Sequence, residues 1–111
     1  MAKYGTVTYT GKSGKKYEFT AYSWDTNFKE NYGAVYFITK RSQNNEGGYS
    51  HTRIYVGQTE DMAERFDDHH DAPCFKSKGA NCKCVYGESN KQTRLQIEKD
   101  LIDNYDPPCN G

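Results

Sequence analysis

The chain of 111 residues lacks any long apolar segment. No run approaches the roughly 20 apolar residues that a helix needs to cross a bilayer. The first residues also do not form the apolar core of a secretory signal peptide. We therefore expect an intracellular protein without membrane contacts. Only 34% of the residues are hydrophobic, so a core must use many of the ten tyrosines. The length fits one domain.

An excess of charge of one sign is absent as well. Fifteen basic and fifteen acidic residues give a formal net charge of zero, which argues against strong non-specific binding of polyanions. The charges are nevertheless unevenly distributed. Acidic residues gather in residues 60–71, and basic residues gather in residues 76–83 and 91–94. A local basic surface therefore remains available for an anionic ligand.

The four cysteines lack the paired Cys-x-x-Cys spacing that is typical of structural zinc sites. Without a secretory context we expect reduced thiols or metal ligands, not disulfides. Cys82 and Cys84 would face the same side of a strand. The candidate zinc ligands are His70, Cys74, Cys82, Cys84 and Cys109. Ordinary reduced cysteines are the alternative, and we favour that interpretation.

Alternating apolar and polar residues predict several short strands. We expect them at residues 6–10, 17–22, 33–39, 53–57 and 83–86. Residues 42–50 are rich in Asn and Gly and indicate a flexible loop. One helix should begin after Thr59 as N-cap and end at Pro73. A second should cover residues 91–105, with Ser89 and Gln92 as a capping box. The fold class is α+β, a small antiparallel sheet flanked by helices.

Glu98 has an unusual position in the second predicted helix. On a helical wheel of about 100° per residue, it lies near the centre of the apolar arc. That arc is formed by Leu95, Ile97, Leu101, Ile102 and Tyr105. Burying an unpaired carboxylate costs roughly several kcal/mol. Glu98 therefore requires a cation, a hydrogen-bond partner or an open pocket. A functional site and a buried ion pair with Lys or Arg are both consistent with this position.

Two of the predicted strands carry a recognisable motif. Residues 33–36 read Gly-Ala-Val-Tyr and residues 54–57 read Ile-Tyr-Val-Gly. This pair resembles the two signature strands of the GIY-YIG endonuclease family, with Gly33 and Gly57 as its glycines. The resemblance covers residues 32–111, and residues 1–31 would form an added N-terminal β-hairpin.

The polar residues that follow continue the resemblance. Arg65 lies ten residues after Tyr55, and His69 lies four residues later. Glu98 begins a Glu-x-x-Leu-Ile sequence, and Asn110 lies near the end of the chain, as in the C-terminal motif of the family. The resemblance implies hydrolysis of phosphodiester bonds in double-stranded or branched DNA. It also implies one divalent metal, Mg²⁺ or Mn²⁺, bound by Glu98, and leaves room for a partner protein that supplies DNA specificity.

The resemblance also implies a role for each remaining polar position. Arg65 would neutralise the scissile phosphate. Tyr36 and Tyr55 would position or deprotonate the attacking water. His69 would hydrogen-bond one of the tyrosines or the nucleophile. Asn110 would tie the C-terminal segment to the site.

The chain departs from the family pattern in two places. The connection between the signature strands, residues 42–50, is longer than the usual short turn. Gln58 stands where many relatives have a lysine that helps to activate the tyrosine. The alternative function is therefore a non-catalytic module that binds nucleic acid or protein and retains the nuclease fold.

Overall fold

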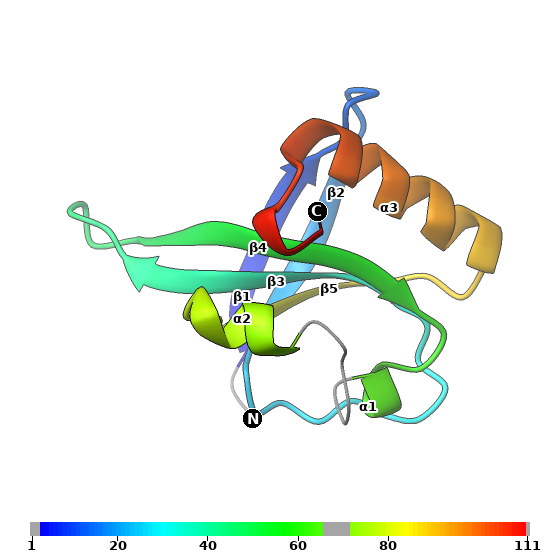
Figure 1. The fold of residues 1–111 in the computed structure, drawn as a ribbon, viewed down its shortest axis with the longest axis horizontal. Helices are drawn as coiled ribbons and strands as arrows, with labels where there is room; N and C mark the ends of the chain where they lie inside the picture. Colours follow the sequence, from blue (N-terminus) through cyan, green and yellow to red (C-terminus); the bar gives the residue numbers. More distant parts are fainter. Residues whose placement is uncertain (1–2, 66–71, 111) are drawn as a thin grey trace.

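The structure, a computed structural model, describes residues 3–65 and 72–110. A five-stranded antiparallel sheet with the order β1-β2-β5-β3-β4 forms its centre (Figure 1). The strands are β1 (Lys3–Thr10), β2 (Lys16–Ser23), β3 (Ala34–Gln43), β4 (Tyr49–Thr59) and β5 (Cys82–Gly87). Strand β5 pairs with both β2 and β3. The N-terminal hairpin is therefore continuous with the rest of the sheet, and β4 forms one edge.

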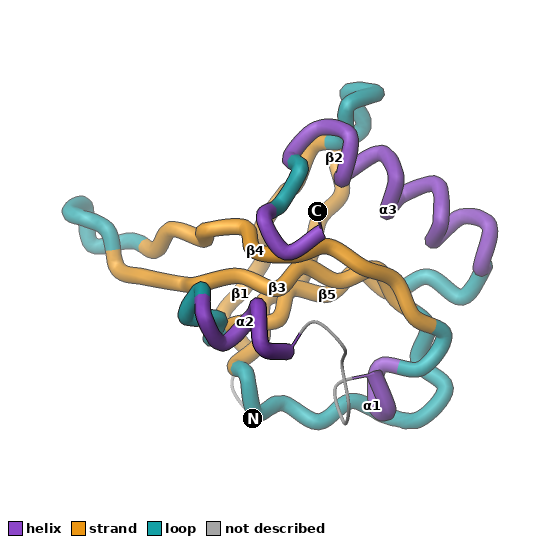
Figure 2. Tube along the Cα trace, viewed as in Figure 1, coloured by secondary structure: helices purple, strands orange, loops and turns teal. Residues whose placement is uncertain are grey.

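Helices cover both faces of the sheet (Figure 2). They are α1 (Met62–Arg65), α2 (Ala72–Ser77) and α3 (Lys91–Tyr105), followed by the 3-10 turn η1 (Pro108–Asn110). The expected α+β class is confirmed. Within residues 3–65 and 72–110, no helix is long and apolar enough to cross a membrane.

The alternation of side chains along β3 divides the core into two clusters. Val35 and Phe37 point to the α3 side and pack with residues such as Tyr9 and Leu101. Tyr36 and its neighbours on that face pack with residues of α1, α2 and η1: Met62, Phe75 and Cys109. Successive side chains of a strand point to opposite faces, so one short apolar strand supplies both clusters.

A β-bulge interrupts the pairing of β3 with β4. Ile38 pairs with Tyr55 and Thr39 pairs with Arg53, so Ile54 is the extra residue. Ile54 and Tyr55 consequently belong to the same core cluster. The extra residue shifts the alternation by one, so the side chains of β4 before the bulge point to the opposite face of the sheet from the face that strict alternation would predict.

The connection within residues 42–50 is shorter than we predicted. Strands β3 and β4 extend to Gln43 and from Tyr49, and the connection is a tight turn at the end of a projecting arm (Figure 2). The Asn44 side chain accepts hydrogen bonds from the N–H groups of Glu46 and Gly48, at 3.0 Å each. Asn favours turns because its side chain can replace backbone partners in this way.

The predicted end of the first helix at Pro73 is wrong. Its predicted N-cap is also wrong: Asp61 caps α1, because its Oδ1 accepts a hydrogen bond from the N–H of Ala63 at 3.0 Å, and Thr59 only accepts one from the N–H of Asp61 at 3.1 Å. Residues 66–71, which include His69 and His70, lie outside the described residues. Pro73 lies in the first turn of α2, where the missing N–H of proline costs nothing. It does not terminate a helix.

The predicted capping box of α3 and part of its buried face are also wrong. Asn90 is the N-cap, and its side chain accepts a hydrogen bond from the N–H of Thr93 at 3.0 Å. Leu95 is 37% exposed, whereas Arg94 is only 3% exposed. A charged residue therefore occupies a position on the buried face that the wheel assigned to apolar residues.

Candidate active site at the edge of β4

The C-terminal segment is attached to the outer edge of β4. The N–H of Val56 donates a hydrogen bond to Oδ1 of Asn110 at 2.9 Å, and Nδ2 of Asn110 donates to the carbonyl of Val56 at 2.8 Å. The amide thus satisfies both backbone groups of an edge residue that would otherwise face no strand. Asn110 therefore ties the C-terminal segment to β4 at the residue between Tyr55 and Gly57.

Gly57 allows two tyrosine rings to lie directly over the strand. A Cβ atom on Gly57 would lie 2.7 Å from the Tyr36 hydroxyl and 2.7 Å from Cε2 of Tyr55. No side chain fits at such distances. The centroids of the two rings are 6.1 Å apart, and the ring planes are inclined by 33°. Glycine at this position therefore brings the two predicted tyrosines together.

Arg65 is held by one of these tyrosines. Its Nε donates a hydrogen bond to the Tyr36 hydroxyl at 2.9 Å. Tyr36 is completely buried, and burial followed by the adjacent Tyr55 raises the pKa of its hydroxyl, although Arg65 acts in the opposite direction. Tyr36 consequently stays protonated at neutral pH. It acts as an acceptor that orients the guanidinium of Arg65.

A second guanidinium lies on the other side of the strand end. Nε of Arg94 donates to the side-chain oxygen of Gln58 at 3.0 Å. Nη1 donates to the carbonyls of Glu88 and Ser89, at 3.0 Å and 2.8 Å. A Cβ on Gly33 would lie 2.7 Å from Nη1 of Arg94. Gly33, the first glycine of the motif, thus leaves space for the guanidinium of Arg94, which belongs to the basic cluster at residues 91–94.

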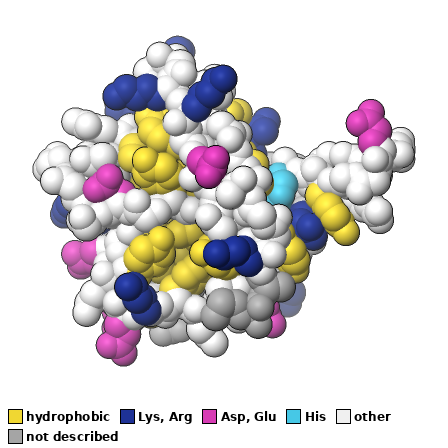
Figure 3. Space-filling model, turned by 180° about the vertical axis from the view of Figure 1, so that it is seen from behind, with side chains coloured by type: hydrophobic (Ala, Val, Ile, Leu, Met, Phe, Trp, Pro, Cys, Tyr) yellow, Lys and Arg dark blue, Asp and Glu magenta, His cyan; other side chains and the backbone are white. Residues whose placement is uncertain are grey.

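The two arginines border a polar pocket of about 330 Å³. It is lined by Gln58, Thr59, Glu60, Arg65, Lys91 and Arg94. Three cationic side chains face one carboxylate, so the pocket favours an anion such as a phosphate group. On the face shown in Figure 3, the basic side chains are separated from one another by apolar and neutral ones.

Glu98 lies beside this pocket without lining it. It is half-buried, and burial raises the pKa of its carboxyl. A hydrogen bond with the Gln58 backbone and the charge of Arg65 act in the opposite direction. Within residues 3–65 and 72–110, no basic group lies within salt-bridge distance of Glu98. Glu98 therefore does not form the buried ion pair with Lys or Arg that was the alternative. Its carboxylate oxygens retain lone pairs that can bind a further ligand.

Five of the six predicted catalytic positions meet at residues 55–58 of β4. Two lie on the paired strands, Tyr36 and Tyr55. The other three arrive from α1, α3 and η1: Arg65, Glu98 and Asn110. The sixth, His69, lies outside the described residues. Sequence reasoning missed Arg94, for which the glycine at position 33 was the available signal.

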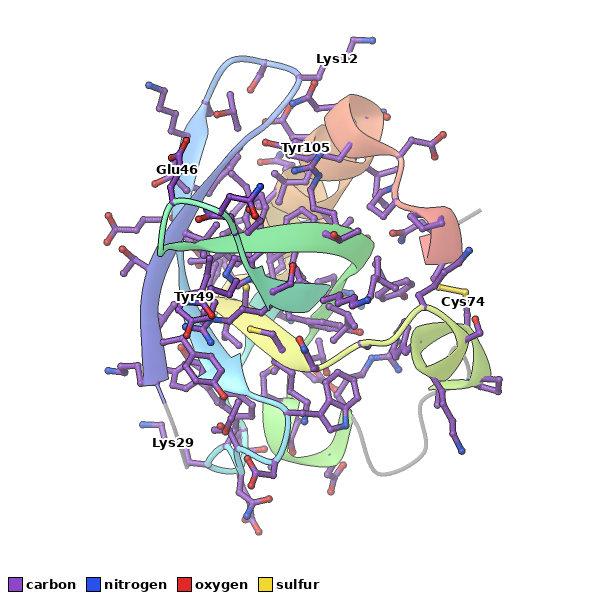
Figure 4. The ribbon with its side chains drawn as sticks, turned by 90° about the vertical axis from the view of Figure 1, so that its left-hand side faces the viewer. Lys12, Lys29, Glu46, Tyr49, Cys74 and Tyr105 are labelled. Carbon is purple, nitrogen blue, oxygen red and sulfur yellow. A yellow bond between two sulfur atoms is a disulfide. The ribbon has the colours of Figure 1, made fainter. Side chains whose placement is uncertain are left out.

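The predicted zinc set does not assemble. Cys74 of α2 and Cys109 of η1 form a disulfide (Figure 4), so neither sulfur is available as a thiolate ligand. Cys82 and Cys84 are reduced and lie in the core cluster on the other face of the sheet. His70 lies outside the described residues. Disulfides persist mainly in oxidising compartments, so the expected intracellular location stays a prediction.

Comparisons of the chain with protein-family models, with curated proteins and with solved structures found no match. The resemblance to the GIY-YIG family consequently stays a prediction from the order and spacing of the motif residues.

Proposed function

We propose that the chain is a metal-dependent DNA endonuclease of the GIY-YIG type, which hydrolyses phosphodiester bonds. One observation supports this proposal above all. Arg65, oriented by Tyr36, borders a pocket rich in positive charge, and the half-buried carboxylate of Glu98 lies next to it with no salt bridge to any basic group among residues 3–65 and 72–110. A metal-dependent hydrolysis of phosphodiester bonds uses an anion site and a carboxylate for a hard cation at the same place.

The environment of Glu98 is suitable for Mg²⁺ or Mn²⁺. Mg²⁺ is often bound by one or two carboxylates, with water and substrate oxygens as its other ligands. Glu98 would provide that carboxylate, and the bound ion would draw negative charge from the phosphate oxygens. Burial raises the pKa of Glu98, and a bound cation would offset this effect because a nearby positive charge favours the charged form of a carboxyl group.

The protein residues have distinct tasks in this proposal. Arg65 neutralises the phosphate that is attacked, since its guanidinium is fixed before the substrate binds. Lys91 binds the same or an adjacent phosphate, and Arg94, which is buried and held by Gln58, adds its positive charge at the pocket wall. Tyr36 stays protonated and holds Arg65. Tyr55, which is 8% exposed, is the tyrosine that remains to orient the attacking water.

The charge distribution limits how tightly this domain holds DNA. Only three cations line the pocket, and the formal net charge of the chain is zero. Affinity for DNA depends strongly on the number of phosphates neutralised. We therefore expect weak binding to long duplexes by this domain alone. A branched structure or a partner protein would provide the specificity.

The experiment that tests the proposal is a cleavage assay on supercoiled plasmid and branched DNA. We expect the purified protein to nick or cut one of these substrates with Mg²⁺ or Mn²⁺, and cutting to stop when EDTA is added. The Arg65→Ala variant should be at least about 100-fold slower, by analogy with the loss of one fixed charge-stabilising donor. Absence of cutting under all conditions, or equal cutting by Arg65→Ala, would contradict the proposal.

A binding module is the second candidate, and one contact favours it. Gln58, in the place of the activating lysine of many relatives, has its side chain engaged by Arg94 at 3.0 Å. In a binding module the pocket would hold a phosphate without cutting the chain. DNA binding that is lost in Arg65→Ala, together with no cleavage in either metal, would favour this candidate.

A further inference from the structure

A histidine and two cysteines converge inside the core cluster that α3 covers. One ligand atom each from His51, Cys82 and Cys84 lies within 4.8 Å of the other two. Nδ1 of His51 is 3.9 Å from Sγ of Cys84. Both cysteines are completely buried, and His51 is partly exposed. These residues come from two strands, and β3 lies between those strands in the sheet.

The bulge in β4 is what brings His51 to this face. Tyr55 belongs to the opposite core cluster, and simple alternation would place His51, four residues earlier, on the same side as Tyr55. The extra residue, Ile54, reverses the direction of the preceding side chains. On β5, Cys82 and Cys84 are two residues apart and therefore share one face.

The surroundings contain a polar group without a satisfied hydrogen bond. The Tyr9 hydroxyl is buried and, among the residues that the structure describes, has no hydrogen-bond partner of normal geometry. It lies beside the sulfurs of Cys82 and Cys84. Burial and these two cysteines raise the pKa of the hydroxyl, and the positive charge of Arg53 lowers it. Buried hydroxyls normally have partners. The hydroxyl beside the two sulfurs is therefore still available as a hydrogen-bond donor or acceptor for another group in this cluster.

We propose that His51, Cys82 and Cys84 bind one Zn²⁺ ion, with the fourth position directed toward the Tyr9 hydroxyl. Zinc with about 2.3 Å bonds to sulfur and about 2.1 Å bonds to nitrogen places those ligand atoms about 3.6 Å apart in a tetrahedron. The observed 3.9 Å between His51 and Cys84 needs only a small adjustment. Two thiolates and one Zn²⁺ ion are neutral together, which suits a buried position.

Thr39 completes the environment of the ion. Its hydroxyl lies 3.0 Å from Nδ1 of His51, and it is completely buried. It is also a hydrogen-bonding neighbour of Cys82 and Cys84. When Nδ1 binds zinc, this hydroxyl exchanges the imidazole for a thiolate as its partner. Such outer hydrogen bonds are typical of zinc sites.

This site is separate from the proposed nuclease centre and does not depend on it. Sulfur and imidazole ligands select zinc, whereas a lone carboxylate favours Mg²⁺ or Mn²⁺. The two sites also lie at different places along β4. Glu98 is hydrogen-bonded to the backbone of Gln58, which follows the bulge, whereas His51 precedes the bulge. The zinc would be structural, joining the β3–β4 arm to the N-terminal hairpin through β5.

Cobalt substitution tests the proposal directly. We expect the full chain, with its disulfide intact, to bind one Co²⁺ ion per molecule with sulfur-to-cobalt charge-transfer bands and visible bands of tetrahedral cobalt. Zinc should displace the cobalt and abolish these bands, and elemental analysis should then find one zinc per chain. The thermal midpoint should rise on addition of zinc.

Variants make the result specific. His51→Ala should weaken Co²⁺ binding at least about 100-fold, because loss of even an outer partner costs about 10- to 100-fold. Cys82→Ser should weaken the charge-transfer bands, because only Cys84 then supplies a thiolate. The matched control Cys74→Ser/Cys109→Ser, which alters the two other cysteines, should retain them. His51 is partly exposed, so its variant should stay folded even if Cys82→Ser does not. A folded wild type without cobalt–sulfur bands, or unchanged bands in His51→Ala, would overturn the proposal.

Discussion

We expect Glu98→Gln to lower the rate of DNA cleavage at least about 1,000-fold while the protein stays folded. Glutamine keeps the size of the side chain and its hydrogen bond with the Gln58 backbone, but it lacks the negative charge that a divalent cation requires. The loss should therefore appear in the rate at saturating DNA, with little change in DNA affinity. A single-turnover cleavage assay with Mg²⁺ measures it.

The stability of the same variant should change in the opposite direction from its activity. Burial raises the pKa of Glu98 in the folded state, so the charged carboxylate opposes folding at neutral pH. We expect Glu98→Gln to have a slightly higher thermal midpoint than wild type at pH 7. The difference should disappear below the pKa of an unfolded glutamate, where the carboxyl is protonated in both states.

A surface glutamate provides the matched control for this prediction. Glu46 is exposed at the tip of the β3–β4 arm, and Glu46→Gln should leave both cleavage and stability unchanged. Loss of cleavage in both variants, or full activity in Glu98→Gln, would contradict the role of Glu98. A lower thermal midpoint of Glu98→Gln would instead show that its carboxylate stabilises the fold.

The second large effect concerns the disulfide. Replacing Cys74 and Cys109 by serine should lower the free energy of unfolding by about 4 kcal/mol, because the bond closes a loop with a sequence separation of 35. Cys109 is also buried beside Met62 and Phe75, so polar replacements weaken that cluster further. Urea denaturation of the wild type and of the double variant measures the difference.

Reduction of the wild type supplies the control. A reducing agent should destabilise the wild type by a similar amount and have almost no effect on the double variant. Because η1 carries Asn110, its release should also loosen the two hydrogen bonds with Val56 at the site. Equal stability of the oxidised wild type and the double variant would show that this disulfide does not restrain the unfolded chain.

The strands and the tyrosine pair could be predicted from the sequence because they depend on local patterns. Alternating residues predicted a strand at 33–39 and another at 53–57, which overlap β3 and β4, and Tyr36 and Tyr55 were identified from the motif on these strands. Gly57 was identified as a motif glycine, but its contact with both tyrosine rings came only from the structure. Glu98 was recognised because a carboxylate near the centre of an apolar arc is energetically unfavourable without a ligand.

The features that could not be predicted depend on long-range geometry. No local signal placed β5 between the two hairpins, and this placement separates Cys82 and Cys84 from the disulfide pair on the other face. The bulge at Ile54 is invisible in the alternation of residues 53–57, yet it decides which face His51 joins. Arg94 is buried because backbone carbonyls and Gln58 satisfy its guanidinium, which a helical wheel does not represent.

The location of a bound divalent ion tests the central claim most directly. Mn²⁺ broadens the NMR signals of nearby amides, so small additions to ¹⁵N-labelled protein should first broaden Gln58 and Glu98. The same additions to Glu98→Gln should leave these two amides sharp. Broadening elsewhere on the molecule, or equal broadening at Gln58 in both proteins, would contradict a metal site on Glu98 at the edge of β4.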